Sequence, residues 1–112
     1  MEIKHDYFSD ESEIMAELEA AGHQSVDLEF GAESNGPHWH DFDAVVYITA
    51  GELTVTDVET GETCICVRGS RITANRGVLH SEETPGYRAT VGLAGKFEDL
   101  TQPINKPPPV AL

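Results

Sequence analysis

Along most of this chain, apolar and polar residues alternate with the period of two that is typical of β-strands. Residues 26–30 alternate strictly between apolar and acidic side chains, as expected of a half-buried strand. Residues 44–49 are almost all apolar and rich in β-branched side chains, which favours a strand covered on both faces. Further short β-rich stretches lie at residues 53–56, 64–67, 72–74, 78–81 and 87–94. Many short strands at close spacing predict an antiparallel sandwich or barrel.

A helical period occurs near the beginning of the chain, at residues 10–22. Ile14, Leu18 and Ala21 form one apolar stripe, acidic residues crowd the first turn, and Gly22 can end the helix. A helix of about three turns needs support from tertiary packing. We therefore predict a short helix whose apolar stripe packs against the outside of a sheet.

The length of 112 residues and the 39% hydrophobic content indicate one domain with one core. We divide the chain into an N-terminal segment with the helix (residues 1–24), a barrel (residues 25–97) and a proline-rich tail (residues 98–112). Prolines cannot occupy central strands, so the tail is predicted to be an extended arm that is disordered or lies over a neighbouring molecule.

The chain is strongly acidic. Twenty acidic against seven basic residues give a formal net charge of −13. Such a surface repels nucleic acid and anionic lipid, so neither is expected as a partner. We also expect a cytoplasmic protein, because no stretch reaches the roughly 20 apolar residues of a membrane span and the first residues are polar rather than leader-like.

Cys64 and Cys66 lie two residues apart in a predicted strand and so share one face of it. A disulfide between such positions would need a distorted backbone. The pair is interpreted as buried free thiols, with a Cys-x-Cys metal site as the alternative.

Histidines supply the main chemical signal in this sequence. His38 and His40 flank Trp39 at the entry to a predicted strand, where both imidazoles would project to one face with about 7 Å between Cα atoms. Two neutral imidazoles that converge in this way can bind iron(II), zinc, nickel or copper. Further along, the glycines of the segment 69–80 permit turns that aim His80 inward from a different strand. Together they predict a site with three histidine ligands.

These two segments resemble the two motifs of the cupin superfamily, Gly-x5-His-x-His-x3,4-Glu-x6-Gly and Gly-x5-Pro-x-Gly-x2-His-x3-Asn. His38, His40 and Gly51 match the first motif in spacing, and Gly69, Gly77 and His80 match the second. The resemblance covers residues 26–94. It implies an all-β, antiparallel jelly-roll barrel, one divalent metal ion (iron, zinc, nickel or manganese), a small-molecule ligand or substrate, and a homodimer.

The sequence departs from this pattern at one metal ligand. The glutamate of the first motif falls on Ala44, and the neighbouring Asp43 has the wrong strand parity to replace it. What remains is a three-histidine site, similar to that of cupins resembling cysteine and β-diketone dioxygenases. Glu82 lies two residues after His80 and should face the same way, so it is a candidate metal ligand or catalytic acid/base. The alternative is a solvated acid at the mouth of the barrel.

Other positions are predicted to surround the pocket. We place Phe42, Ala44, Tyr47 and Arg76 there. The two aromatic side chains could instead belong to the core, and the arginine could either bind a substrate carboxylate or simply balance the acidic surface.

The hypothesis that follows is a metal-dependent enzyme acting on a small oxygenated organic substrate. Iron(II) would support oxygen insertion or C–C cleavage, whereas zinc or nickel would act as a Lewis acid in isomerisation, dehydration or cyclisation. The first alternative is a non-catalytic cupin that binds or senses a ligand or metal. The second is a barrel whose histidines bind nothing, and fold analogy alone does not decide between them.

Overall fold

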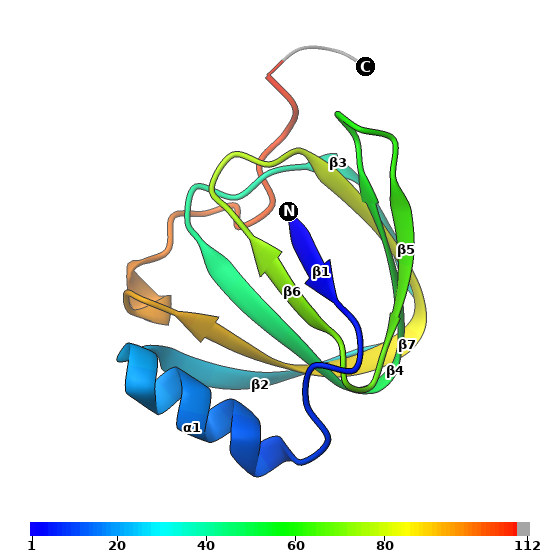
Figure 1. Cartoon of the computed structure of the whole chain (residues 1–112). Helices are drawn as coiled ribbons and strands as arrows, with labels where there is room; N and C mark the ends of the chain where they lie inside the picture. Colours follow the sequence, from blue (N-terminus) through cyan, green and yellow to red (C-terminus); the bar gives the residue numbers. More distant parts are fainter. Residues whose placement is uncertain (110–112) are drawn as a thin grey trace.

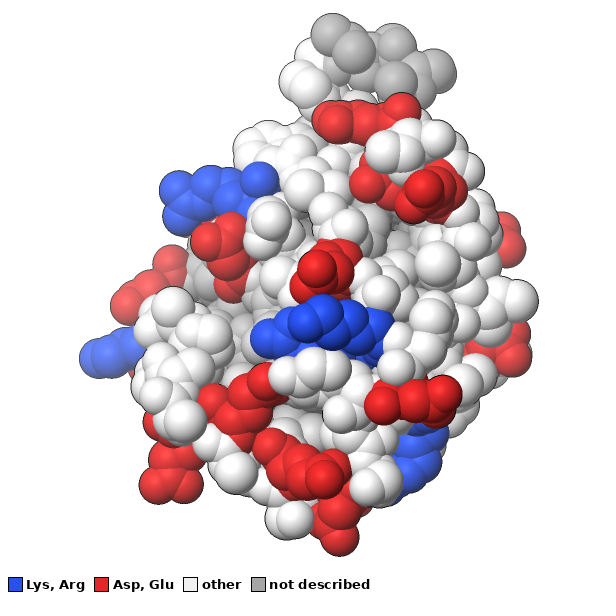
Figure 2. Space-filling view, viewed as in Figure 1, with Lys and Arg blue, Asp and Glu red and all other residues white. Residues whose placement is uncertain are grey.

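The computed structural model describes residues 1–109 and consists of a rolled β-sheet with one α-helix on its outside (Figure 1). The elements in chain order are β1 (Glu2–Lys4), α1 (Glu11–Ala21), β2 (Gln24–Phe30), β3 (Glu33–His38), β4 (Ala44–Asp57), β5 (Thr63–Val67), β6 (Arg71–Ala74), β7 (His80–Leu93) and a 3-10 helix η1 (Phe97–Asp99). In this described part of the chain, no helix is long and apolar enough to cross a membrane. Acidic side chains are spread over the face shown in Figure 2, with basic ones between them.

All strand pairs are antiparallel, and the order across the sheet is β1-β6-β4-β7-β2. β3 also pairs with β7, and β5 also pairs with β4. The long central strands β4 and β7 therefore each serve two sets of neighbours and bend the sheet around a common interior (Figure 1). The predicted all-β, antiparallel jelly-roll class is confirmed.

Two irregularities in the β4–β7 ladder decide which side chains face the interior. From Ile48 to Ala50, β4 advances by two residues while β7 advances by one, so β4 carries an extra residue. From Gly86 to Glu83, β7 advances by three residues while β4 advances by two, so here β7 carries the extra residue. Each extra residue reverses the inward–outward alternation of its strand. The interior is accordingly lined by even-numbered residues of β4 before the bulge and by odd-numbered ones after it. In β7, His80 and Glu82 face inward before the bulge, and odd-numbered residues from position 87 onward do so after it.

Gly51 makes the close crossing of these strands possible. Its φ is +76°, and a Cβ there would lie 2.2 Å from the Gly86 carbonyl oxygen and 2.8 Å from the Tyr87 Cα. Any other residue would force β4 away from β7. The β-rich stretches at residues 44–49 and 53–56 are therefore two parts of one long strand that bends at this glycine.

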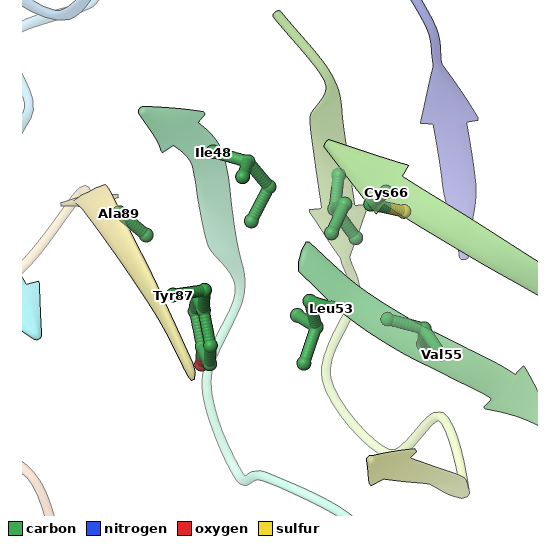
Figure 3. Packing of buried hydrophobic residues seen from close by; sticks show 7 residues of the cluster. Ile48, Leu53, Val55, Cys66, Tyr87 and Ala89 are labelled. Carbon is green, nitrogen blue, oxygen red and sulfur yellow. The ribbon is translucent and has the colours of Figure 1, made fainter. Parts of the chain in front are cut away.

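Two apolar clusters lie on opposite sides of the sheet. The interior cluster consists of Ile48, Leu53, Val55, Cys66, Ile72, Tyr87 and Ala89 (Figure 3). The outer cluster consists of Phe8, Ile14, Leu18, Val45 and Tyr47, and fixes helix α1 against the sheet. This helix confirms the sequence prediction. It starts with a capping box at Asp10 and ends at Gly22 in the left-handed conformation.

The proline-rich tail was expected to be disordered or to lie over a neighbouring molecule, and this expectation is wrong for the described residues. Residues 97–107, here called the C-terminal strap, fold back onto the barrel of their own chain. Trp39 and Lys106 exchange backbone hydrogen bonds, and the Trp39 Nε1 donates to the Pro107 carbonyl at 2.7 Å. The Lys106 ammonium donates to the carbonyl oxygens of Thr101 and Pro103, which holds the strap in a compact turn.

Candidate metal centre

The structure brings the predicted ligands together inside the barrel. His38 ends β3 and pairs directly with His80, which begins β7, so these two imidazoles face each other across neighbouring strands. His40 follows two residues later, and Glu82 enters from the same face of β7 as His80. One ligand atom from each of the four side chains lies within 4.8 Å of all the others.

Backbone carbonyl groups fix the orientation of all three imidazole rings. Each ring uses its Nδ1 to contact a carbonyl oxygen, which can only accept a hydrogen bond. The acceptors are Gly36 for His38 (2.7 Å), Val78 for His80 (2.9 Å) and Ile104 for His40 (3.0 Å). Nδ1 must therefore carry the proton, so Nε2 of the neutral ring keeps a free lone pair. Metal-binding histidines in proteins are usually oriented in this way.

Glu82 contacts two of these rings through one carboxylate oxygen. Its Oε1 lies 3.1 Å from the His38 Nε2 and 3.4 Å from the His80 Nε2. Burial opposes ionisation of Glu82, but the hydrogen bonds and charges of the two histidines outweigh it and lower the pKa to about 2. Burial likewise opposes protonation of His38, yet its contacts with Glu82 and Gly36 raise the net pKa of the ring.

His40 differs from the other two rings in its charge state. Burial, together with the neighbouring histidines, lowers the pKa of His40 despite its bond to the Ile104 carbonyl. The ring is therefore neutral near pH 7 and offers its lone pair. Since the acceptor for His40 belongs to the C-terminal strap, that segment helps to build the centre.

The donor set fits a divalent transition metal ion. Ligands around such an ion lie about 2.0–2.3 Å from it and so about 3–4 Å from one another. The four ligand atoms here lie within 4.8 Å of one another, so a small contraction would bring them to these distances. Three imidazole nitrogens and one carboxylate oxygen suit iron(II), nickel, zinc or manganese. Without a cation, His38 and His80 can satisfy Glu82 only by carrying protons on both ring nitrogens. A bound metal ion would replace those protons and supply the balancing charge.

The centre opens onto a cavity of about 810 Å³ in the barrel, where His40, His80 and Glu82 form part of the wall. Most other lining residues are apolar and come from β2, β4, β6 and β7. The C-terminal strap contributes Phe97, Leu100 and Ile104. Among residues 1–109, no lysine or arginine side chain lines this cavity.

Of the four residues predicted to surround the pocket, two line the cavity and two do not. Phe42 and Ala44 line the cavity as expected, and Phe42 stacks on His40 with ring centroids 5.2 Å apart. The placement of Tyr47 is wrong, because its odd position in the first half of β4 turns it outward into the cluster beneath helix α1. The placement of Arg76 is also wrong, because it lies exposed in the turn before β7.

The neighbouring Asp43 has a structural role in that turn. Its Oδ1 accepts a hydrogen bond from the Arg76 backbone N–H at 2.7 Å. Its carboxylate is therefore engaged away from the cluster, as its strand parity suggests, and Glu82 is the carboxylate that joins the histidines.

Cys64 and Cys66 are both free, and Cys66 is fully buried in the interior cluster. Burial, and to a lesser extent the nearby Cys64, raises the pKa of the Cys66 thiol to about 11. A protonated, buried thiol is a poor nucleophile and a poor metal ligand, which supports the interpretation of these cysteines as packing residues.

Two contributors to the site were missed by sequence reasoning. The Tyr87 ring lines the cavity, but its inward orientation depends on the bulge in β7, for which the sequence carries no clear signal. The Ile104 carbonyl orients His40, and a backbone group leaves no trace in side-chain patterns. The prolines of the strap were visible, but they did not reveal where the strap packs.

Comparison with solved structures finds several proteins of similar fold. A DUF861 family protein from Thermotoga maritima superposes with a TM-score of 0.63 and 19% identity over 82% of this chain and 99% of its own. An RmlC-like cupin from Shewanella frigidimarina gives a TM-score of 0.57 and 22% identity, covering 70% of each chain. The polyketide cyclase RemF from Streptomyces resistomycificus gives 0.55 and 22%, over 65% of this chain and 55% of the cyclase.

No family model and no curated protein matches this sequence. The similarity to solved structures therefore concerns the fold, and at this level of identity it does not transfer an activity. The chain has the cupin fold, and within it the cluster of three histidines and one glutamate could hold a metal ion.

Proposed function

We propose that this protein is a metal-dependent enzyme that acts on a small, predominantly apolar organic substrate bearing oxygen functions. The observation that carries the proposal is the cluster itself: three imidazoles with Nδ1 held by carbonyl groups, and a carboxylate, on the wall of an apolar cavity. A divalent metal ion held there would act as a Lewis acid toward a substrate oxygen, or, if it were iron, would support oxygen chemistry.

In this proposal His38, His40, His80 and Glu82 are the metal ligands. Glu82 then takes the place of the glutamate that the cupin motif would have at Ala44, from a different strand. A pKa of about 2 suits an anionic ligand better than a general base, which works best with a pKa near the ambient pH. Ala44 meanwhile leaves room in the cavity that a glutamate would fill.

The cavity supports the proposed substrate class. Its walls are mostly apolar, and among the described residues no basic side chain reaches it to bind an acidic group. An aromatic or aliphatic carbonyl compound would bury its carbon skeleton against β2, β4 and β7 and direct one oxygen to the metal. The similarity in fold to a protein described as a polyketide cyclase agrees with such a substrate.

Metal-dependent exchange of α-protons tests this function without knowledge of the substrate. Protein stripped of metal and reconstituted separately with manganese, iron(II), nickel or zinc would be incubated in D₂O with simple cyclic ketones. We expect deuterium incorporation, detected by NMR, in at least one metal form, or oxygen consumption in the iron form. Both should be absent from metal-free protein and from a His38→Ala/His80→Ala variant. Neither activity in any fully loaded form would contradict the enzymatic proposal.

A second candidate is a non-catalytic cupin that binds a ligand. The predominance of apolar residues in a cavity of about 810 Å³ favours it, since such a cavity can hold a hydrophobic compound without any reaction. Tight binding of ketones by the metal-loaded protein, with no exchange and no oxygen consumption, would identify this alternative.

We also propose a homodimer, formed through strand β5. Within the described chain β5 pairs only with β4, and it exposes Ile65 (58%) and Val67 (48%) beside its free edge. Sedimentation velocity should give the mass of a dimer, and an Ile65→Glu/Val67→Glu variant should give a monomer. A wild-type monomer at all concentrations would contradict the proposal.

A further inference from the structure

A tyrosine in the wall of the cavity has a hydroxyl group that bonds to no other described residue. Tyr87 is 9% exposed and belongs to the interior cluster, where its neighbours include Ile48, Leu53 and Ala89. Figure 3 shows its ring projecting from β7 into the space beside the segment of β4 that carries Leu53. Within residues 1–109, burial and the charges of Glu82 and Glu33 act on the Tyr87 hydroxyl, but no hydrogen bond does. The hydroxyl oxygen is not one of the fully buried atoms that lack a partner, so it remains accessible from the cavity and is available to a ligand.

The Tyr87 ring is held firmly, so the free hydroxyl does not result from loose packing. The ring stacks on Phe30 with centroids 5.0 Å apart and an interplanar angle of 22°. Its backbone lies directly beneath Gly51, in the closest approach of the two central strands. The bulge between Gly86 and Glu83 turns Tyr87 to the face of β7 that also carries His80 and Glu82. One cavity thus contains the metal centre and a rigid phenol.

The phenol is suited to donate a hydrogen bond. Burial, together with the negative charges of Glu82 and Glu33, raises the pKa of Tyr87 well above its usual value, so the hydroxyl keeps its proton at neutral pH. A phenylalanine would fill the same apolar space but would present no donor to the cavity. A tyrosine at this position is explained if a ligand brings an acceptor to it.

The structure assigns Tyr87 as a second polar anchor for the substrate, donating a hydrogen bond to an oxygen other than the one directed to the metal. This inference rests on the proposed function and narrows the substrate class to apolar compounds with two oxygen functions. The first oxygen would reach the histidine–glutamate centre, and the second would lie against Tyr87 within the apolar part of the cavity. Tyr87 would thus determine specificity and orientation.

Matched probes that differ by one oxygen atom can test this assignment. 4-Chromanone and 1-tetralone share a ketone and a bicyclic skeleton, and differ by an ether oxygen in place of a methylene group across the ring. 6-Methoxy-1-tetralone and 6-ethyl-1-tetralone form a second pair with a longer separation between the oxygens. Dissociation constants would be measured by calorimetry on the zinc-loaded wild type, Tyr87→Phe and Tyr7→Phe. Tyr7 is a matched control because it lies outside the cavity wall.

For at least one pair, we expect the wild type and Tyr7→Phe to bind the dioxygenated probe about 3–10-fold more tightly than its carbon analogue, the effect of one net hydrogen bond. In Tyr87→Phe this preference should disappear, while the affinity for the carbon analogue stays within about two-fold of wild type. A preference that persists in Tyr87→Phe, or that is absent from the wild type with both pairs, would overturn the assignment.

Thermal unfolding of the ligand-free proteins provides an independent check. Removing an unpaired hydroxyl should leave the Tm unchanged or raise it slightly, because no internal hydrogen bond is lost. A fall in Tm of more than about 4 °C in Tyr87→Phe would show that the hydroxyl has a structural partner and would overturn the inference. Metal content measured on the same samples separates the two proposals. Full metal loading without a Tyr87-dependent preference refutes only this inference, whereas failure to load metal refutes the proposed function and this inference with it.

Discussion

Two partly buried glutamates, Glu82 inside the barrel and Glu17 on helix α1, each contact several polar side chains, but these partners differ in kind. Glu17 accepts hydrogen bonds from the hydroxyls of Tyr7 and Tyr47, and its Oε2 lies 3.3 Å from the Arg71 Nε. A guanidinium is always charged, and burial together with the bond to Glu17 raises the pKa of Tyr47 to about 12. Every donor in this cluster therefore carries its proton at any physiological pH.

The cluster at Glu82 lacks such permanent donors. Its partners, the Nε2 atoms of His38 and His80, can donate only when the rings are protonated, and their Nδ1 atoms already use a proton on backbone carbonyls. The outer cluster is complete by itself, whereas the inner one requires added protons or a cation. A buried carboxylate alone does not therefore indicate a metal site. The two clusters differ because only the partners of Glu82 can give up protons to a metal ion.

The largest expected effect that tests this comparison is the loss of the anionic ligand. Glu82→Ala should weaken zinc and nickel binding by about 100-fold or more, because even outer-shell partners of metal ligands are worth 10–100-fold. Glu83→Ala is the matched control, since Glu83 is the next residue on the exposed face of β7. Competition with a chromophoric chelator would measure both affinities. Equal affinity in the two variants would show that Glu82 is only a solvated acid.

A smaller effect is expected from removal of the strap segment that orients His40. A chain ending after Leu100 loses the Ile104 carbonyl, and metal affinity should fall by about 10–100-fold. A chain ending after Pro107 keeps the whole strap and should bind metal like the wild type. The same chelator competition, with circular dichroism to verify folding, would compare them. If both truncations bind equally well, the strap has no part in the centre.

The smallest effect concerns the outer cluster, which should influence stability but not metal binding. Glu17→Gln should lower the free energy of unfolding near pH 7 by about 1–2 kcal/mol, a value reduced for the partial exposure of this side chain. Glu19→Gln, on the exposed face of the same helix, should change little. Urea denaturation would measure stability, and metal affinity should stay unchanged in both variants. A loss of metal binding in Glu17→Gln would contradict the separation of the clusters.

The stabilisation by Glu17 should also depend on pH in a defined direction. Although burial opposes ionisation, the bonds from Tyr47, Tyr7 and Arg71 lower the pKa of Glu17 in the folded state. Its contribution is therefore complete above the unfolded value of about 4.3 and is lost as the pH falls through the lowered folded value. The difference between wild type and Glu17→Gln should shrink below about pH 4. A difference that grows on acidification would contradict this account.

Much of the fold and of the histidine centre could be predicted from the sequence. The period-two pattern predicted an antiparallel sandwich or barrel, and the resemblance of the two histidine segments to the cupin motifs narrowed it to a jelly roll. Motif spacing and strand parity are local properties, so they also brought His38, His40 and His80 together. Glu82 was found by the same parity rule, over only two residues.

Three other features were misjudged, each for a different reason. Tyr47 was placed in the cavity, although counting from Ala44 along β4 turns it to the outer face. Tyr87 was not recognised, because the bulges that reverse parity in β4 and β7 arise from how the strands cross and not from either strand alone. The strap was misjudged because its contacts with Trp39 and His40 join segments more than 60 residues apart.

Metal analysis of the purified protein tests the central claim most directly. Protein prepared without a histidine tag would be dialysed and examined by plasma mass spectrometry beside the His38→Ala/His80→Ala variant. The account predicts about one equivalent of a divalent transition metal per chain in the wild type, after reconstitution if required, and essentially none in the variant. Wild-type protein that holds no iron, nickel, zinc or manganese after reconstitution, or a double variant that holds as much, would contradict it.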